Sequence, residues 1–525
     1  MTICGIVSLM QTQRFGTAGK VASRGGERQK PKTTLTSRLR ARKSAEWIRA
    51  RNAAVYKHFQ HAVSEVPAYA PFLKKQHFDA TSVHTSKDIA FIPPISKQNY
   101  LRAFPWKDLS VQNALTTKPL VLTATSGSTG KPFYIPRTDE LHDASAVMHE
   151  LFLERSGLDP KRPTLVMVCF GMGVWIGGLL TYEAFRRASV SGWPLTVITP
   201  GVNKKEIFDA IANIGSAYTQ LVLCGYPPFI KDLIDEGPSH GVRWQKWDMR
   251  IVCAAEAFSE QFRDYLCKKT GIKNPYRGVM NIYGSAELGT MATETPLSIL
   301  LRRLALKHKT LYQKLFSEAH RLPTLAQFVP EFTAFEASVD GTVYTTSGSV
   351  LPFVRYSIGD QGGVFAYDDM RRWCSESGID LDAEIARAGI ADTVTELPFV
   401  YIYERADLST KLYGAIIFPE HVKAGLQNPL FEKTITGRFT MTTEHDVQHN
   451  EYLEINVELQ RGVSDGTSTE GEMVESIMRS LSGSSDEYHY LLGSIREKIT
   501  PRIIFWPHED PKYFSPGIKQ KWVLQ

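Results

Sequence analysis

The chain has 525 residues and a mass of 59.0 kDa, which suggests about two to four domains and excludes a small disulfide-stapled peptide. Its 43% hydrophobic, 11% aromatic and 22% charged residues are typical of a globular protein, and exclude a wholly disordered, collagen-like or coiled-coil chain. The net charge of +6 is concentrated near the N-terminus, because residues 14–51 hold 12 Lys/Arg and only 2 Asp/Glu. The basic character therefore says little about the partners of the folded body.

The first 43 residues are predicted to be a basic, disordered extension, and the folded part is expected to begin near Ser44. An organelle-targeting peptide, or a segment that adheres to nucleic acid or membranes, are the alternatives for this stretch. The cysteines show neither CxxC pairs nor histidines at zinc spacing, which indicates a reduced, cytoplasmic protein. They are Cys4, Cys169, Cys224, Cys253, Cys267 and Cys374.

One stretch resembles a membrane span, since residues 164–180 carry no charge over 17 residues, close to the spanning length of about 20. Four glycines interrupt it. A buried strand that enters a Gly-rich loop explains this pattern better, because strands covered on both faces are continuously apolar. We therefore predict no membrane span.

In chain order, apolar spacing first predicts an amphipathic helix over residues 45–66, ended by Pro67. Strand-like and helical segments then alternate, which is typical of a parallel sheet with helices on both faces. The strands are predicted at 165–170, 194–199, 220–225, 249–255 and 279–284.

After these strands come a helical insert over residues 295–320 and a β-rich segment with strands near 340–347 and 352–357. We expect a large domain over residues 44–404 and a small mobile α+β domain over 405–525. The predicted fold class is α/β, with a large N-terminal body of parallel and mixed sheets flanked by helices, plus a β-rich subdomain.

The segment TATSGSTGKP (residues 123–132) follows an apolar strand and combines glycines, hydroxyls and one lysine. Such a loop can curl around phosphates, because glycines allow close backbone approach and the N–H and hydroxyl groups donate to anionic oxygens. It is not a Walker A loop, since Thr125 stands five places before Gly130 and Pro132 follows Lys131. A flexible Ser/Thr/Gly surface loop is the alternative interpretation.

Five segments in order resemble the adenylate-forming superfamily of acyl-CoA synthetases, nonribosomal-peptide adenylation domains and luciferases. They are TSGSTGKP, NIYGSAE (281–287), RYSIGD (355–360), ERADLSTKLYGAIIFPE (404–420) and SPGIKQKW (515–522). The segments HAVSEVPAYAPFLKK and FIPPISKQNYLRAFPW are similar to the phenylacetate-CoA ligase branch. The resemblance covers roughly residues 45–524.

The resemblance implies that the TSGSTGK loop holds the β- and γ-phosphates of ATP. The residues concerned are Thr125, Ser126, Gly127, Ser128, Thr129, Gly130 and Lys131. It also implies that Glu287 holds Mg²⁺ together with phosphate oxygens, a role that suits a hard cation. A solvated surface glutamate is the alternative for Glu287.

Further nucleotide contacts are implied by the same resemblance. Tyr283 would pack against adenine, or else be a core aromatic at a strand end. Asp360 would accept hydrogen bonds from the ribose hydroxyls, or else belong to a Gly-Asp turn. Arg405 would lie near the ribose, with a hinge salt bridge as its alternative. Asp407 falls on the hinge of the small domain.

Lys519 is the candidate for the mobile lysine that bridges the carboxylate and the α-phosphate, with Lys521 as the fallback because Ile518 separates the lysine from Gly517. Ala286 departs from the family pattern, which has threonine before the acid. Ser285 is the candidate substitute.

The acyl pocket is expected at the carboxyl edge of the parallel strands, where open α/β folds bind ligands. Candidate lining residues are Phe170, Met172, Trp175 and Ala254, which would suit an aromatic or otherwise apolar acid; core packing is the equal alternative.

Together these features predict an ATP- and Mg²⁺-dependent ligase that forms an acyl-adenylate, releases pyrophosphate and passes the acyl group to a thiol, with coenzyme A as the expected acceptor. A carrier-protein thiol, an amine, or transfer of AMP itself are alternatives. A non-catalytic nucleotide-binding relative is a third, motivated by Ala286 and the shifted lysine. No nucleic-acid partner is expected, and both monomer and homodimer stay open.

Overall fold

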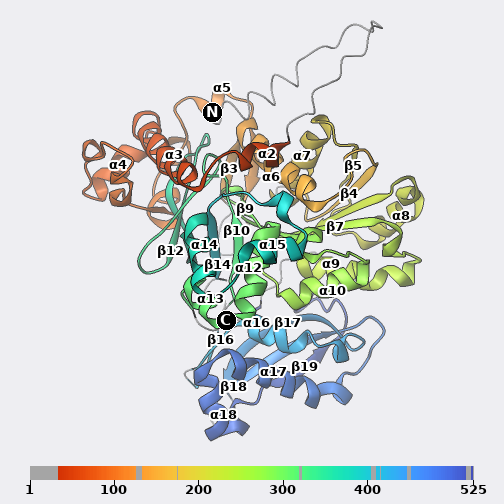
Figure 1. Cartoon of the computed structure of the whole chain (residues 1–525). Helices are drawn as coiled ribbons and strands as arrows, with labels where there is room; N and C mark the ends of the chain where they lie inside the picture. The colour runs from red at the N-terminus through yellow and green to blue at the C-terminus, as the bar shows by residue number, and fades with distance from the viewer. Residues whose placement is uncertain are drawn as a thin grey trace, which may run out of the picture.

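The computed structural model describes residues 34–125, 133–173, 176–318, 322–403, 410–413, 415–445, 451–515 and 522–523. Its larger part is built on one sheet with the strand order β11-β12-β13-β14-β10-β9-β8-β7-β6-β4-β5, and a smaller part follows at the C-terminus (Figure 1).

Five parallel strands form one half of the large sheet, in the spatial order β5-β4-β6-β7-β8. Along β4, alternate side chains enter different cores: Leu165 and Met167 join one, and Val166 and Val168 the other. Both faces are therefore covered, which explains the continuous apolar runs. The strands are β4 (Thr164–Cys169), β5 (Leu195–Ile198), β6 (Gln220–Gly225), β7 (Asp248–Ala254) and β8 (Val279–Ser285).

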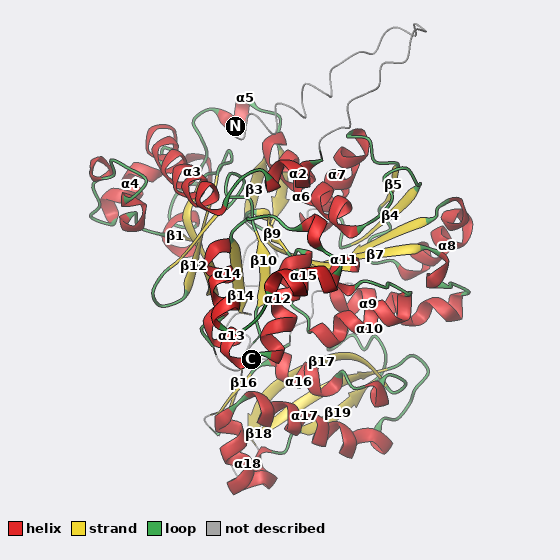
Figure 2. Cartoon of the chain, in the orientation of Figure 1, coloured by secondary structure: helices red, strands yellow, loops and turns green. Residues whose placement is uncertain are grey.

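Helices lie on both sides of these strands (Figure 2). One core joins the strands to α6 (Asp139–Ser156) and α7 (Ile176–Val190). The opposite core joins them to α8 (Lys204–Ile214), α9 (Pro227–Glu236) and α10 (Glu260–Thr270). The predicted strand–helix alternation is confirmed, and residues 164–180 form β4 and the start of α7. No helix in the described ranges is long and apolar enough to cross a bilayer.

The other half of the sheet is mostly antiparallel and begins with β9 (Gly289–Thr293), which pairs with β8. It continues through β10 (Thr324–Gln327), β14 (Phe399–Tyr403), β13 (Phe353–Phe365), β12 (Thr342–Ser347) and β11 (Ala334–Ala337), while β1 (Ile95–Ser96) pairs with β13. On one face lie α3 (Ser44–Glu65) and α4 (Tyr69–Lys75). On the other lie α12 (Pro296–Lys307), α13 (Lys309–Leu315), α14 (Tyr367–Glu376) and α15 (Leu381–Ala388).

The described structure begins at residue 34, before the expected residue 44. Helix α2 (Leu35–Arg40) buries Leu35 and Leu39 in a core with Trp47 and residues of α6. The backbone N–H groups of Leu35 and Thr36 donate to the Glu154 carboxylate at 2.8 and 2.7 Å. The many basic residues in 34–43 favour a disordered extension, but Leu35 and Leu39, four residues apart, form the buried face of a helix.

The C-terminal part forms a separate three-stranded sheet in the order β17-β18-β19. Its core includes Phe439, Ile455 and Tyr488. The elements are β15 (Thr410–Leu412), β16 (Ala415–Ile417), α16 (Pro419–Leu426), β17 (Ile435–His445), β18 (Glu451–Leu459), α17 (Glu470–Ser484), α18 (Asp486–Ile499) and β19 (Arg502–Trp506). The predicted boundary at residues 404–405 lies outside the described residues and stays a prediction.

Candidate functional site

The site is built where the parallel strands end, and its first member is the base of the predicted phosphate loop. The hairpin of β2 (Val121–Ala124) and β3 (Tyr134–Arg137) flanks this loop. The Thr125 N–H donates to the Phe133 carbonyl at 3.0 Å, and Thr125 Oγ1 accepts from the Phe133 N–H at 3.1 Å. These bonds close the loop at its base. Ser126, Gly127, Ser128, Thr129, Gly130 and Lys131 lie outside the described residues.

Arg137 links this hairpin to the loop that carries Glu287. The Arg137 side chain is 2% exposed, and its Nε donates to Thr123 Oγ1 at 2.8 Å. Its guanidinium also donates to the carbonyl oxygens of Ala286 and Glu287. Burial lowers the pKa of Arg137 to about 9, while the Glu287 carboxylate opposes that shift. The sequence alone does not single out Arg137, because one arginine at the end of a strand belongs to no recognisable motif.

Glu287 is buried, at 6% exposure, and its Oε1 lies 3.0 Å from Lys97 Nζ. The surface alternative for Glu287 is therefore wrong. Lys97 follows β1 and belongs to the PPISK segment, which we had noted only as a likeness of the phenylacetate-CoA ligase branch. The Lys97 ammonium compensates the charge of this carboxylate, which would be costly to bury without a partner.

Tyr283 and Asp360 meet although they are 77 residues apart, because β8 and β13 bring them to the same region. The Tyr283 hydroxyl donates to Asp360 Oδ2 at 2.5 Å. Asp360 is 8% exposed, and the Tyr283 ring lies 6.0 Å from the Phe335 ring, centroid to centroid. Neither residue is an isolated surface group, and the two form one polar unit beside an aromatic surface.

Two further polar groups lie on the same stretch of chain. Ser285 Oγ accepts from the Leu288 N–H at 3.1 Å, which leaves its own hydroxyl hydrogen available to donate. Asn281 Nδ2 donates to the Glu256 carbonyl at 3.0 Å, whereas the buried Asn281 Oδ1 has no hydrogen-bond partner within the described ranges. Asn281 was not nominated, although it opens the NIYGSAE motif.

The candidate acyl-pocket residues fall in one apolar cluster. Phe170 is fully buried in it, and Met172 and Ala254 pack against its edge. The Phe170 ring meets the Tyr226 ring at a centroid distance of 5.1 Å. Phe170 is therefore a core residue, whereas Met172 and Ala254 remain candidates for lining the predicted acyl pocket. Trp175 lies outside the described residues.

Arg405, Asp407, Lys519 and Lys521 also lie outside the described residues, but both ends of the segment 516–521 are anchored on β17. Arg438 donates to the carbonyls of Phe514 and Ser515 at 2.9 and 3.2 Å. On the other side, the Met441 N–H donates to the Trp522 carbonyl at 2.7 Å. The described residues on both sides of the segment 516–521 are therefore held by the same strand.

The C-terminal part contacts the larger part through α8 and α10. Ser259 Oγ donates to Gln427 Oε1 at 3.1 Å, and Lys204 Nζ lies 3.7 Å from Glu509 Oε1. Lys269 Nζ lies 3.4 Å from Glu432 Oε2. These contacts are polar and mostly half-exposed, which suits an interface that can separate.

No family model matches the chain, and no curated protein matches it. Solved structures do match. A 2-hydroxyisobutyryl-CoA ligase in the postadenylation state, in complex with R3-HIB-AMP, superposes with a TM-score of 0.66 at 14% identity, over 97% of this chain and 96% of that one. The same ligase with 2-HIB-AMP and CoA in the thioesterification state gives 0.53 at 14% identity, over 97% and 96%.

An open conformation of that ligase with 2-HIB-AMP and CoA gives a TM-score of 0.54 at 13% identity, over 97% of this chain and 98% of that one. This chain therefore has the same fold over nearly its whole length.

Proposed function

We propose that this chain, which has the fold of the adenylate-forming ligases, activates a carboxylic acid with ATP and transfers the acyl group to the thiol of coenzyme A. The observation that carries the proposal is the hydrogen bond between Tyr283 of β8 and Asp360 of β13, together with the buried Glu287, which follows β8. Nearly full-length agreement with a ligase caught with its adenylate and with CoA supports it.

The nucleotide would lie against Tyr283 and Asp360. A carboxylate has two oxygens with about four acceptor positions, so Asp360 can bind a ribose hydroxyl in addition to the Tyr283 phenol. The buried Asn281 Oδ1 suits an N–H donor such as the amino group of a base. The flat Tyr283 ring can stack on that base.

The phosphates would lie between the base of the phosphate loop at Thr125 and the Lys97–Glu287 pair. Within the described ranges no cluster of three or more His, Cys, Asp or Glu could hold a metal by itself. One buried carboxylate nevertheless fits Mg²⁺, which usually takes one or two carboxylates plus substrate phosphates. When bound there, Mg²⁺ would supply charge neutralisation for the leaving pyrophosphate.

In the first step, a carboxylate oxygen of the acid attacks the α-phosphorus of ATP, the bond to the bridging oxygen breaks, and pyrophosphate leaves. Two anions must approach each other, so cationic side chains must compensate the growing charge. Lys97 and Arg137 do this from the large domain, and we assign the same task to Lys519, with Lys521 as the alternative, from the small domain.

In the second step, the sulfur of coenzyme A attacks the acyl carbon, AMP leaves, and the thiol proton passes to solvent. The small domain must then move, because its mobile lysine and the thiol both need access to the same carbon–oxygen–phosphorus unit. A ligase of the same fold has been captured in a postadenylation and in a thioesterification state, which supports such a rearrangement here, with Asp407 as the proposed hinge.

A second candidate function is nucleotide binding without turnover. Ala286 favours it, because a methyl group stands where a threonine hydroxyl would contact the α-phosphate. The Ser285 hydroxyl, which still has a hydrogen to donate, argues for turnover.

Carboxylate-dependent exchange of pyrophosphate into ATP tests the proposal. The wild type is assayed over aryl, aliphatic and amino acids beside Lys519→Ala and Lys521→Ala, with Lys205→Ala, an exposed lysine on α8, as the control. We expect exchange with one class of acid, lost in one of the two C-terminal variants only. Mg-ATP binding without exchange for any acid would instead support the non-catalytic candidate.

A further inference from the structure

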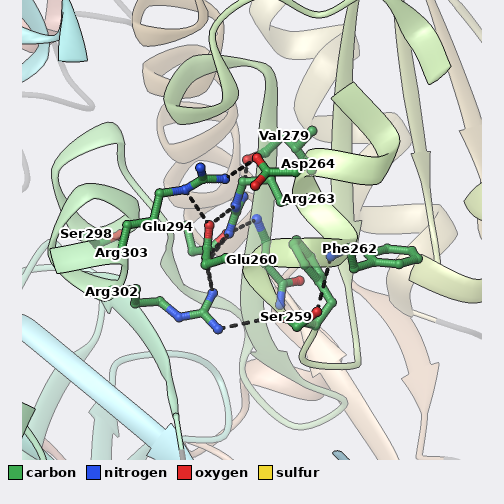
Figure 3. Close-up of polar contacts among 12 residues, drawn as sticks. Ser259, Glu260, Phe262, Arg263, Asp264, Val279, Glu294, Ser298, Arg302 and Arg303 are labelled. Carbon is green, nitrogen blue, oxygen red and sulfur yellow. Dashed lines mark hydrogen bonds and ion pairs between the residues drawn. The ribbon is translucent and has the colours of Figure 1, made fainter. Parts of the chain in front are cut away.

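A network of buried charges lies behind the nucleotide end of the site, and nothing described so far uses it (Figure 3). Two carboxylates, Glu260 and Glu294, alternate with the guanidinium groups of Arg263, Arg302 and Arg303. Arg263 and Glu294 have fully buried side chains, and their closest atoms are 2.8 Å apart. Burial alone would raise the pKa of Glu260, but Arg263 and Arg302 hold it below its ordinary value, so the carboxylate is charged.

Two hydrogen bonds connect this network to β8. The Asn281 N–H donates to Glu294 Oε2 at 2.9 Å, and Arg263 Nη1 donates to the Val279 carbonyl. These contacts fix the strand two residues before Tyr283. The Asn281 side chain in turn donates to the Glu256 carbonyl at 3.0 Å, so the same strand holds the start of the loop that follows β7.

That loop, residues 255–258, is strained. Ala255 has a φ of +77°, in the left-handed region that a residue with a Cβ avoids, and its side chain is exposed. Ala254, just before it, pairs with Ile282 of β8, so the loop leaves the sheet beside Tyr283. A strained conformation persists only where its surroundings impose it.

Arg302 of α12 holds the C-terminal end of this loop, at Phe258. Its Nη1 donates to Glu260 Oε1 at 2.8 Å and to Glu294 Oε1 at 3.0 Å, while its Nη2 donates to the Phe258 carbonyl at 3.1 Å. The Arg263 guanidinium covers the Phe258 ring, 4.9 Å from its centroid. Arg302 therefore joins both carboxylates to the backbone of the strained loop, whereas Arg263 reaches only the Phe258 ring.

We infer that Arg302 is a positioning residue for the nucleotide site: it holds the loop 255–258 against β8 in the conformation that receives the base beside Tyr283. This inference rests on the proposed function. Helix α12 therefore does more than pack against the sheet. It places the planar guanidinium of Arg302 between two carboxylates and a loop carbonyl, and this group can donate to all three.

Arg302→Lys tests the inference, because a lysine keeps the positive charge for Glu260 and Glu294 but cannot also reach the Phe258 carbonyl as a planar fork does. Arg303→Lys is the matched control. Arg303 donates to Glu260 Oε2 at 2.8 Å and to Asp264 Oδ1 at 2.7 Å, but to no atom of the loop. The measurements are the Kd of Mg-ATP by calorimetry and the thermal unfolding midpoint.

We expect Arg302→Lys to weaken Mg-ATP binding about tenfold, the effect of losing one well-placed interaction, while Arg303→Lys stays within about twofold at a similar unfolding midpoint. Adding Ala255→Gly to Arg302→Lys should restore much of the affinity, because glycine adopts the positive φ without a clamp. If Arg302→Lys is too unstable to assay, the double variant Arg302→Lys/Ala255→Gly is compared with the single variant Ala255→Gly. A Kd for Mg-ATP that is still much weaker in the double variant overturns the inference.

Equal changes in Kd for the two lysine variants, or no rescue by Ala255→Gly, would show a purely structural role and overturn the inference. Absence of Mg-ATP binding by the wild type would overturn the proposed function itself. The two failures are therefore distinguishable.

Discussion

Tyr283 illustrates how much of the site depends on one hydrogen bond. Its phenol donates to Asp360, 77 residues away, so each side chain orients the other in the absence of the proposed nucleotide. Preorganisation of this kind lowers the cost of binding, because side-chain freedom is lost at folding rather than at the binding step.

Tyr283→Phe should raise the KM for ATP roughly 3- to 10-fold in the exchange assay, with kcat nearly unchanged, since one hydrogen bond to a charged group is lost. Tyr56→Phe is the control, because the phenol of Tyr56 on α3 donates to the carbonyl of His84 in an exposed loop. A fall in kcat with an unchanged KM would contradict the assignment of Tyr283 to the nucleotide.

Lys97 gives a second prediction at the scale of single residues. Its ammonium lies 3.0 Å from the Glu287 carboxylate, where the phosphates are proposed to bind. Lys97→Met should lower kcat/KM for ATP about tenfold, and Lys97→Arg should retain part of it, because the positive charge attracts the phosphates. If Lys97 only competed with the metal for Glu287, the methionine variant would bind Mg-ATP more tightly instead.

At the scale of elements, most strands and helices of the large domain were predictable. The parallel strands are buried on both faces and separated by amphipathic helices, so the alternation is visible in the sequence. The contacts that build the site were not. Arg137 and Lys97 reach Glu287 from distant strands, and no local pattern records which side chains a sheet will bring together.

The packing of α6 against α7 predicts a dependence of stability on pH. His149 is fully buried, its Nδ1–H donates to the Ser145 carbonyl at 2.8 Å, and its ring meets Phe185 edge-on. Burial lowers the pKa of His149 to about 4, although the Ser145 bond opposes the shift. Since the folded-state pKa lies below the ordinary 6.5, the stability contribution is complete above pH 6.5 and is lost as pH falls toward 4.

The free energy of unfolding should therefore fall by as much as about 3 kcal/mol from this residue between these pH values. His149→Gln keeps a donor for Ser145 but does not titrate, so urea unfolding at several pH values should show a weaker pH dependence. Exchange of the exposed His61 for Gln is the control. Equal pH dependence in wild type and His149→Gln would show that this ring is not the titrating group.

At the scale of the whole molecule, the small domain is held in its present arrangement by a few polar contacts, among them Lys204 with Glu509. Glu509→Lys should slow exchange several-fold, because repulsion from Lys204 disfavours this arrangement of the two parts, in which we propose that the adenylate forms. The transfer of acyl groups from added acyl-adenylate to CoA should not slow.

The control for that prediction is Glu475→Lys, which reverses a somewhat more exposed charge paired with Arg496 inside the small domain. Equal slowing of both half-reactions by Glu509→Lys, or of exchange by both variants, would argue against a role of this contact in domain arrangement.

The central claim is that an acyl-adenylate forms before the thioester. The most direct measurement uses the acid found by exchange, labelled with heavy oxygen in its carboxylate, together with ATP and CoA, and analyses the products by mass spectrometry. If the adenylate forms first, AMP should carry one labelled oxygen. The second step breaks the bond between the acyl carbon and the bridging oxygen, which leaves that oxygen on phosphorus. Unlabelled AMP, or formation of ADP and phosphate, would contradict it.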